Sequence, residues 1–188
     1  MRQKKRKDVF GDREKARDMK TLLLIGGPMG VGKTSVCRCL QKKLNNSVFL
    51  DGDWCWDSNP FLVTEETKEM VMDNIGYLLN SFLRCTAYHY VIFCWVMHEQ
   101  TIIDSILERL DLSGCEVKSF SLLAASDVLK ERLTGDIKDG KREETVIQRS
   151  LERLAAYRAL DTVKIDTSEK TAEEVAEEIA GELRELAG

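Results

Sequence analysis

Apolar residues are gathered along this chain in two kinds of block, which alternate from one end to the other. The first kind is a short, nearly continuous run of Leu, Ile, Val and Phe. Such runs are typical of strands that are covered on both faces of a sheet. They occur at 21–26, 47–50, 90–97, 115–122 and 163–166.

Longer amphipathic segments separate these runs. Their apolar residues recur every three or four positions, which predicts helices with one buried face. We expect helices at 34–44, 64–86, 99–110, 126–134 and 143–160, and a last helix from Thr171. At Thr171 the T-x-x-E pattern with Glu174 predicts a capping box. The alternation of strands and helices predicts a three-layer α/β domain with five parallel strands.

The amino-acid composition limits the class of protein to which this chain can belong. With 188 residues, of which 43% are hydrophobic and 32% charged, the chain can bury its core as one soluble domain. No apolar run is long enough to cross a bilayer, and the N-terminus has no secretory h-region. The six cysteines form no C-x-x-C pair and there are only two histidines, so we expect no metal cluster. We expect the cysteines to be reduced, buried side chains of a cytoplasmic protein.

The charge is uneven along the chain. Residues 1–20 hold nine Lys/Arg against four Asp/Glu, which is a net charge of +5. Because the whole chain has a net charge of −4, residues 21–188 carry −9. The basic cluster from Arg2 to Lys7 is compatible with a nucleic-acid arm or with a solvated tail. We interpret 1–18 as a disordered extension without assigned function, expect no nucleic-acid partner, and place the domain at 19–188.

One motif gives the first chemical prediction. Gly27 to Thr34 reads GPMGVGKT, which fits G-x-x-x-x-G-K-[ST], and it lies between a predicted strand and a predicted helix. In this context backbone N–H groups cradle phosphates, Lys33 reaches the β- and γ-phosphates, and the Thr34 hydroxyl binds Mg²⁺. The chain is therefore expected to bind ATP and Mg²⁺. The candidate nucleotide-binding residues here are Gly27, Met29, Gly30, Val31, Gly32, Lys33, Thr34 and Ser35.

Two carboxylates follow the second predicted strand. Asp51 and Asp53 flank Gly52, and ligands of open parallel sheets bind outside the carboxyl ends of the strands. Phosphoryl transfer needs a bound cation and a group that orients or deprotonates the attacking hydroxyl, and this pair can divide those roles. The alternative is a simple Asp-Gly turn.

A basic constellation follows the fourth strand. Arg142, Arg149 and Arg153 share one face of the predicted helix and are suited to clamp a transferring phosphate. Alternatively, they form a solvated face paired with neighbouring glutamates. The polar segment 134–142 precedes them and contains two glycines, so we interpret it as a mobile lid loop.

Taken in order, these motifs resemble the small P-loop kinases. GPMGVGKT, LDGD, ERLTGD, GKR and RLAAY are similar to elements of nucleoside monophosphate kinases, shikimate kinase, gluconate kinase, adenylylsulfate kinase and chloramphenicol phosphotransferase. The resemblance covers 19–188. It implies the strand order 2-3-1-4-5 with helices on both faces, a lid between the last two strands, and ATP with Mg²⁺ as the phosphate donor.

The resemblance also implies roles for single residues. Asp53 would be the base for the acceptor hydroxyl and Asp51 a carboxylate associated with the metal. Arg132 would stack on adenine, Arg142 would be the lid arginine, and Arg153 would bind an anionic group of the acceptor.

The chain departs from these relatives in two respects. No Asp stands at the end of the run 90–97, and no glycine-rich acceptor loop follows it. The metal would then depend on Thr34 with the Asp51/Asp53 pair, or on Glu99.

The acceptor site is expected beside Asp53. Trp54 and Trp56 favour a flat or apolar acceptor, or alternatively pack against the start of the long helix. The residues expected to bound this site are Asp53, Trp54, Trp56, Asn59, Pro60 and Phe61, with His98 opposite and Arg153 as a further contact.

Together these features predict an ATP-dependent phosphotransferase that acts on a hydroxyl or phosphate of a small molecule or nucleotide. Lys33, Asp53, Arg142 and Arg153 are its candidate catalytic residues. The alternative is a nucleotide-binding regulatory or interaction protein that transfers no phosphate.

Overall fold

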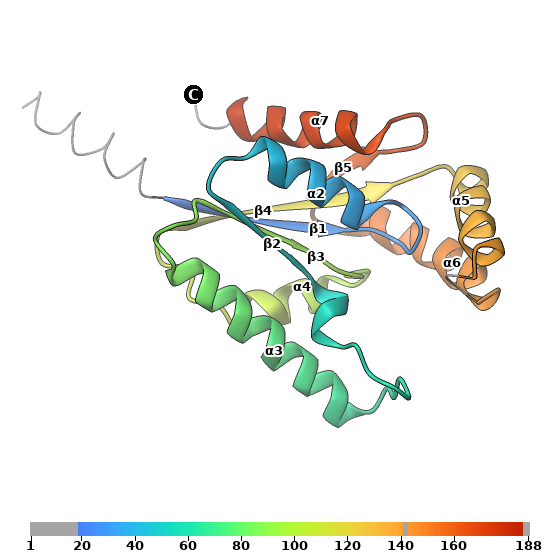
Figure 1. The fold of residues 1–188 in the computed structure, drawn as a ribbon, viewed down its shortest axis with the longest axis horizontal. Coiled ribbons are helices and arrows are strands. Elements are labelled where there is room, and N and C mark those ends of the chain that lie inside the picture. Colours follow the sequence, from blue (N-terminus) through green and yellow to red (C-terminus); the bar gives the residue numbers. More distant parts are fainter. Residues whose placement is uncertain (1–18, 141–142, 186–188) are drawn as a thin grey trace, which may run out of the picture.

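A single five-stranded parallel sheet forms the centre of the protein. The computed structural model describes residues 19–140 and 143–185. The strand order is β2-β3-β1-β4-β5, as expected, and all neighbouring strands are parallel (Figure 1). The strands are β1 Lys20–Gly26, β2 Ser47–Asp51, β3 Tyr90–Cys94, β4 Cys115–Leu123 and β5 Val163–Asp166.

Helices cover both faces of this sheet. In Figure 1, α2 and α7 lie on one face, α3 and α4 lie on the other, and α5 and α6 lie near the carboxyl ends of the strands. None of the helices within the described ranges is long and apolar enough to cross a membrane. The helices are α2 Lys33–Lys43, the 3-10 turn η1 Gly52–Cys55, α3 Glu65–Arg84, α4 Gln100–Leu107, α5 Ser126–Lys138, α6 Thr145–Ala159 and α7 Ala172–Glu185.

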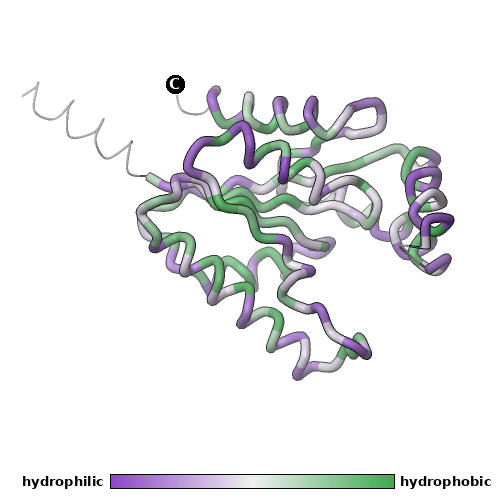
Figure 2. Tube along the Cα trace, in the orientation of Figure 1, coloured by the Kyte–Doolittle hydropathy of each residue, from purple (hydrophilic) through white to green (hydrophobic). Residues whose placement is uncertain are grey.

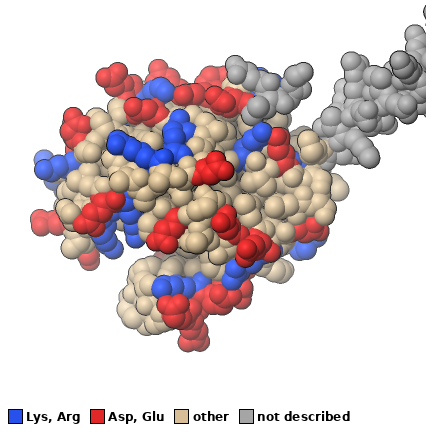
Figure 3. Space-filling view, turned by 180° about the vertical axis from the view of Figure 1, so that it is seen from behind, with Lys and Arg blue, Asp and Glu red and all other residues tan. Residues whose placement is uncertain are grey.

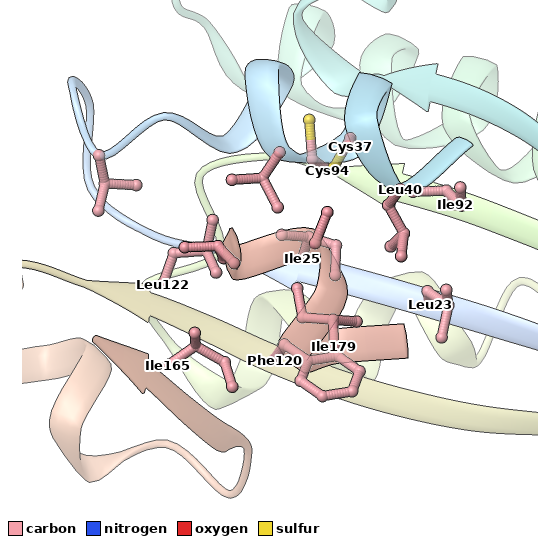
Figure 4. Packing of buried hydrophobic residues seen from close by; sticks show 14 of the residues in the cluster. Leu23, Ile25, Cys37, Leu40, Ile92, Cys94, Phe120, Leu122, Ile165 and Ile179 are labelled. Atoms are coloured by element: carbon pink, nitrogen blue, oxygen red, sulfur yellow. The ribbon is translucent and has the colours of Figure 1, made fainter. Parts of the chain in front are cut away.

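The sheet separates two hydrophobic clusters. Alternate residues of a strand point to opposite faces, so Leu23 and Ile25 enter the cluster under α2 and α7, whereas Leu22 and Leu24 enter the cluster under α3 and α4. We call these the α2-face cluster and the α3-face cluster. Figure 2 shows the central strands as apolar segments between helices of mixed polarity, and Figure 4 shows part of the α2-face cluster.

The six cysteines are free, as expected, but most are less buried than expected. Only Cys37 and Cys94 are buried, and the other four are half-buried. The thiols of these two lie next to each other between α2 and β3 (Figure 4). Burial raises the pKa of Cys37 well above its usual value, so this thiol is a packing group rather than a nucleophile.

Two element boundaries differ from the sequence prediction. The third strand ends at Cys94 rather than at 97, because the pairs of Cys94 with Ile25 of β1 and Asp51 of β2 are the last ones in the two registers. Helix α5 continues to Lys138 instead of ending at 134. The segment 134–138 is therefore helical and not a loop.

The last helix begins as its capping box predicts. The backbone N–H of Glu174 donates to Oγ1 of Thr171, and the backbone N–H of Thr171 donates to Oε2 of Glu174. This reciprocal pair satisfies N–H groups that the first helical turn leaves without a partner.

Candidate functional site

The loop between β1 and α2 has a backbone that requires glycine. Gly27 and Gly30 have φ angles of +153° and +80°. A Cβ atom on Gly27 would lie 2.8 Å from the carbonyl oxygen of Leu122, and one on Gly30 would lie 2.6 Å from the side chain of Leu133. The loop 27–32 is thus curled tightly against the rest of the domain.

Its last glycine starts the helix. Gly32 is the N-cap of α2 with φ +100°, and its carbonyl accepts a hydrogen bond from the N–H of Val36. Lys33 folds back over the loop, where its ammonium group donates to the carbonyl oxygens of Gly27 at 2.9 Å and Pro28 at 3.0 Å. A cation above converging backbone groups at a helix N-terminus is an anion site of the kind that binds phosphate.

The side chains of the loop differ in their surroundings. Val31 is buried in the α2-face cluster and Met29 packs against it, so both stabilise the loop. Ser35 is exposed at the first turn of α2.

Thr34 and Asp51 bring two oxygen groups together beside this loop. Oγ1 of Thr34 donates a hydrogen bond of 2.6 Å to Oδ2 of Asp51. The other oxygen of Asp51 accepts from the N–H of Asp53 at 3.2 Å, and only 5% of the Asp51 surface is exposed. A hydroxyl and a carboxylate are hard oxygen ligands of the kind that Mg²⁺ prefers, so this pair fits a magnesium ion.

Asp53 lies next to this pair on an exposed turn. It belongs to η1, which begins directly after β2, and its side chain is exposed. The N–H bond to Asp51 fixes the turn that carries the second carboxylate. In residues 19–140 and 143–185, no group of three or more His, Cys, Asp or Glu gathers as a candidate metal site.

A pocket opens on the α2 side of the loop. Arg132 of α5 is anchored at its base, because one guanidinium nitrogen donates to the Thr167 carbonyl at 2.7 Å and another to the Thr167 hydroxyl at 3.1 Å. A guanidinium anchored in this way has a flat cationic face of the kind on which an aromatic ring can stack. The pocket has a volume of about 110 Å³ and is lined by Gly30, Val31, Gly32, Val36, Arg132, Thr167, Lys170, Ala172 and Val175.

Arg153 lies on the other side of the loop, near His98 and Tyr157. Burial, and then the charge of Arg153, lower the pKa of His98, although Glu99 opposes this shift. Burial raises the pKa of Tyr157, while the N–H groups of Gly27 and Met97 and the charge of Arg153 act in the opposite direction. His98 Nδ1 and the Tyr157 hydroxyl are buried without a hydrogen bond of normal geometry to any described residue.

The two predicted acceptor tryptophans have different neighbours. Trp54 packs edge-on against Phe49 at 5.3 Å between ring centroids, and the guanidinium of Arg38 lies 5.7 Å from its ring, which places it towards α2. Trp56 instead contacts Phe61 at 4.9 Å and packs against the α3-face cluster.

One of the predicted arginines, Arg149, is not brought to the site by any contact among the described residues. Arg149 turns back along α6, where its guanidinium donates to the hydroxyl of Thr145 at 3.3 Å. Arg142 lies outside the described residues, so its role stays a prediction.

Sequence reasoning missed Trp95 and Thr167. Trp95 follows β3 and its ring lies against Gly52, the residue between the two carboxylates. Thr167 anchors Arg132 from the connection after β5. The signal for Trp95 was present: a large aromatic at a strand end, where a carboxylate was expected, and a glycine at the end of the neighbouring strand.

One protein family has a sequence model that matches most of this chain. A family model described as an AAA domain matches residues 23–155. No curated protein gives a significant sequence match.

Solved structures share the fold at low sequence identity. A tunicamycin resistance protein from Deinococcus radiodurans is 23% identical with a TM-score of 0.65, and the match covers 87% of this chain and 95% of that chain. A gluconokinase from Sinorhizobium meliloti 1021 is 21% identical with a TM-score of 0.67, covering 90% and 94%. A shikimate kinase from Acinetobacter baumannii in complex with shikimate is 21% identical with a TM-score of 0.61, covering 89% and 94%. At these identities the likeness concerns the fold.

Proposed function

The chain belongs to the AAA domain family of P-loop proteins, and from this premise we propose that it is an ATP-dependent phosphotransferase. It moves the γ-phosphate of ATP to a hydroxyl or phosphate of a small molecule or nucleotide. The observation that carries this proposal is the hydrogen bond between Thr34 and Asp51 beside the phosphate loop, with Asp53 two residues further on. A loop that only bound nucleotide would not need this second carboxylate at its edge.

The nucleotide site is assigned to the loop and the pocket beside it. Lys33 and the N–H groups of the loop bind the β- and γ-phosphates, and Arg132 stacks on the base. Thr34 and Asp51 hold Mg²⁺. Bound Mg²⁺ and ATP supply the phosphoryl group and a cation that neutralises its charge.

Asp53 is the proposed base. Its carboxylate orients the acceptor hydroxyl and takes up its proton as the oxygen attacks phosphorus. Arg153 and Arg142 stabilise negative charge in the transition state, and closure of 134–142 excludes water. Because 134–138 is helical, we assign the bending of this lid to Gly140, which has φ +70°.

The similar structures support a small-molecule acceptor. Two of the three solved proteins described above are named as a gluconokinase and a shikimate kinase. The six free cysteines are compatible with a reducing compartment, and we propose a cytoplasmic location.

A screen for acceptor-dependent ADP release tests this function. Nucleosides, nucleotides and small hydroxylated metabolites are added to protein, ATP and Mg²⁺, and at least one is expected to accelerate ADP formation. Lys33→Ala should abolish this acceleration, whereas Lys42→Ala, an exposed lysine of the same helix, should not. If ATP binds but no acceptor accelerates ADP formation, the protein is a nucleotide-binding regulator and not a transferase.

A further inference from the structure

Trp95 lies against Gly52, the residue between the two carboxylate-bearing residues. A Cβ atom on Gly52 would lie 2.5 Å from Cγ of Trp95 and 2.6 Å from Cδ1, so the indole lies directly on the backbone between Asp51 and Asp53. Only glycine leaves room for this ring. Trp95 is half-buried and packs against the α3-face cluster, on the side of the sheet away from the pocket of Arg132.

Further aromatic and apolar groups lie along the same region. Trp56 packs against the same cluster as Trp95 and contacts the ring of Phe61. Eight large hydrophobic side chains are exposed among the described residues, and four of them lie between positions 61 and 70. These four are Phe61, Leu62, Val63 and Met70.

This apolar segment is set apart from the body of the protein. The connection between η1 and α3 projects from the lower edge of the molecule in Figure 1. Figure 3 shows a protrusion at the lower edge whose left part is uncharged and whose right part and tip carry charges of both signs, with a hollow between the uncharged part and the body. Apolar groups gathered in one place on a surface of mixed charge are typical of a binding site.

A buried polar atom without a partner among the described residues lies in the same part of the chain, on His98, and the charge of Arg153 acts on both His98 and Tyr157 of the α3-face cluster. His98 follows Trp95 by three residues, and its buried Nδ1 has no hydrogen-bond partner in the described part of the chain. A buried polar atom without a partner costs free energy unless a ligand or water satisfies it. The region thus combines a flat apolar surface with one fixed hydrogen-bonding group.

We propose that Trp95, seated on Gly52, is the surface on which the acceptor stacks, so that the acceptor is a flat ring compound with a polar substituent that reaches His98. An aromatic alcohol or a nucleoside has this chemistry, and an open-chain polyol does not. The ring lies on the indole, which brings its hydroxyl towards Asp53, and Trp56 with Phe61 closes the outer edge. This assignment deepens the proposed function and rests on it.

The experiment compares two classes of acceptor and three variants. Nucleosides and aromatic alcohols form the ring class, and glycerol, sugar alcohols and gluconate form the polyol class. Binding is measured by calorimetry with Mg²⁺ and a non-hydrolysable ATP analogue, and transfer by ADP release with ATP. The variants are Trp95→Leu, Trp95→Phe and, as control, Tyr77→Leu, which removes a 71% exposed aromatic ring of α3.

We expect Trp95→Leu to weaken binding of the acceptor and not binding of ATP. Ring compounds should bind and accelerate ADP release, and Trp95→Leu should raise their Kd and KM about tenfold or more, as loss of a stacking surface does. The KM for ATP should change less than about twofold. Trp95→Phe should retain most of the affinity and Tyr77→Leu all of it. If Trp95→Leu does not fold, Gly52→Ala displaces the same ring and should have the same effect.

Other outcomes separate this inference from the proposed function. Acceleration by polyols alone, or an unchanged acceptor Kd in Trp95→Leu, overturns the stacking surface and leaves the transferase intact. Binding of ring compounds through Trp95 without ADP release overturns the transferase and leaves the ligand class intact. If neither class binds, the inference is wrong.

Discussion

The hydroxyl of Thr34 donates a 2.6 Å hydrogen bond to the carboxylate of Asp51 across 17 residues of sequence. This bond joins the first turn of α2 to the end of β2, so the phosphate loop and the carboxyl edge of the sheet are positioned relative to each other. In the proposed magnesium site, two oxygen ligands would therefore be in place before the cation binds, which would lower the entropic cost of binding it.

Asp51→Asn should weaken the metal site without unfolding the domain. Asparagine retains an oxygen that accepts from Thr34 but loses the negative charge, so the Mg²⁺ concentration for half-maximal activity should rise about tenfold or more. The rate of ADP release is measured against Mg²⁺ concentration. Asp57→Asn, which changes an exposed carboxylate beyond η1, is the control, and equal Mg²⁺ curves for the two variants would remove Asp51 from the site.

Asp53→Asn should lower turnover and leave ATP binding unchanged. A general base contributes roughly 10²–10⁴-fold to the rate, and its action is confined to the transition state. We expect kcat to fall within this range and the KM for ATP to stay within about twofold. Steady-state kinetics with a saturating acceptor check this, and a variant with normal kcat would show that Asp53 is not the base.

Gly30→Ala should disrupt the phosphate loop more than Gly114→Ala disrupts its own turn. Both glycines have positive φ, +80° and +71°, so both substitutions strain the backbone by about 1 kcal/mol. Only at Gly30 would the new Cβ also meet a side chain, that of Leu133 at 2.6 Å. ATP affinity and the free energy of unfolding should both fall in Gly30→Ala. Gly114→Ala should lose stability only, and the same loss of ATP affinity in both would contradict the packing argument.

His98 should make the fold less stable as the solution becomes acidic. Its pKa in the folded protein lies below the usual 6.5, so the unfolded chain takes up the proton first as the pH falls through 6.5. Stability is then lost between pH 6.5 and the lower folded pKa, because the proton would place a charge on a partly buried ring and beside Arg153. Thermal unfolding midpoints at pH 7.5 and 5.5 measure this loss. It should be smaller in His98→Gln than in wild type, and an equal loss in both would show that His98 is not its cause.

Much of the fold was readable from the sequence because its signals are local. The apolar runs, the phosphate-loop motif and the capping box of Thr171 each depend on residues close together in the chain, and the resemblance supplied the strand order. The contact between Trp95 and Gly52 joins the ends of two neighbouring strands that are far apart in the sequence. Its two parts, an aromatic residue and a glycine at strand ends, predict the contact only once the strand order is known.

The sequence prediction ended helix α5 four residues too early, at 134 instead of Lys138, and the reason is energetic. Gly135 lowers helix stability by about 1 kcal/mol relative to alanine, which the sequence prediction took as a break. Ile137 packs against the α2-face cluster and compensates for this cost, and the residues around it are compatible with a helix. Tertiary packing therefore overrode a local signal.

The two hydrophobic clusters have a consequence for redesign. Arg132 and its pocket belong to the α2 side of the sheet, whereas Trp95, Trp56 and Tyr157 belong to the α3 side, and the phosphate loop is the boundary. Mutations distant from each other and without shared partners are usually additive in free energy. Directed evolution of α3 and the connection before it should therefore change the specificity for the acceptor. The specificity for ATP should stay the same.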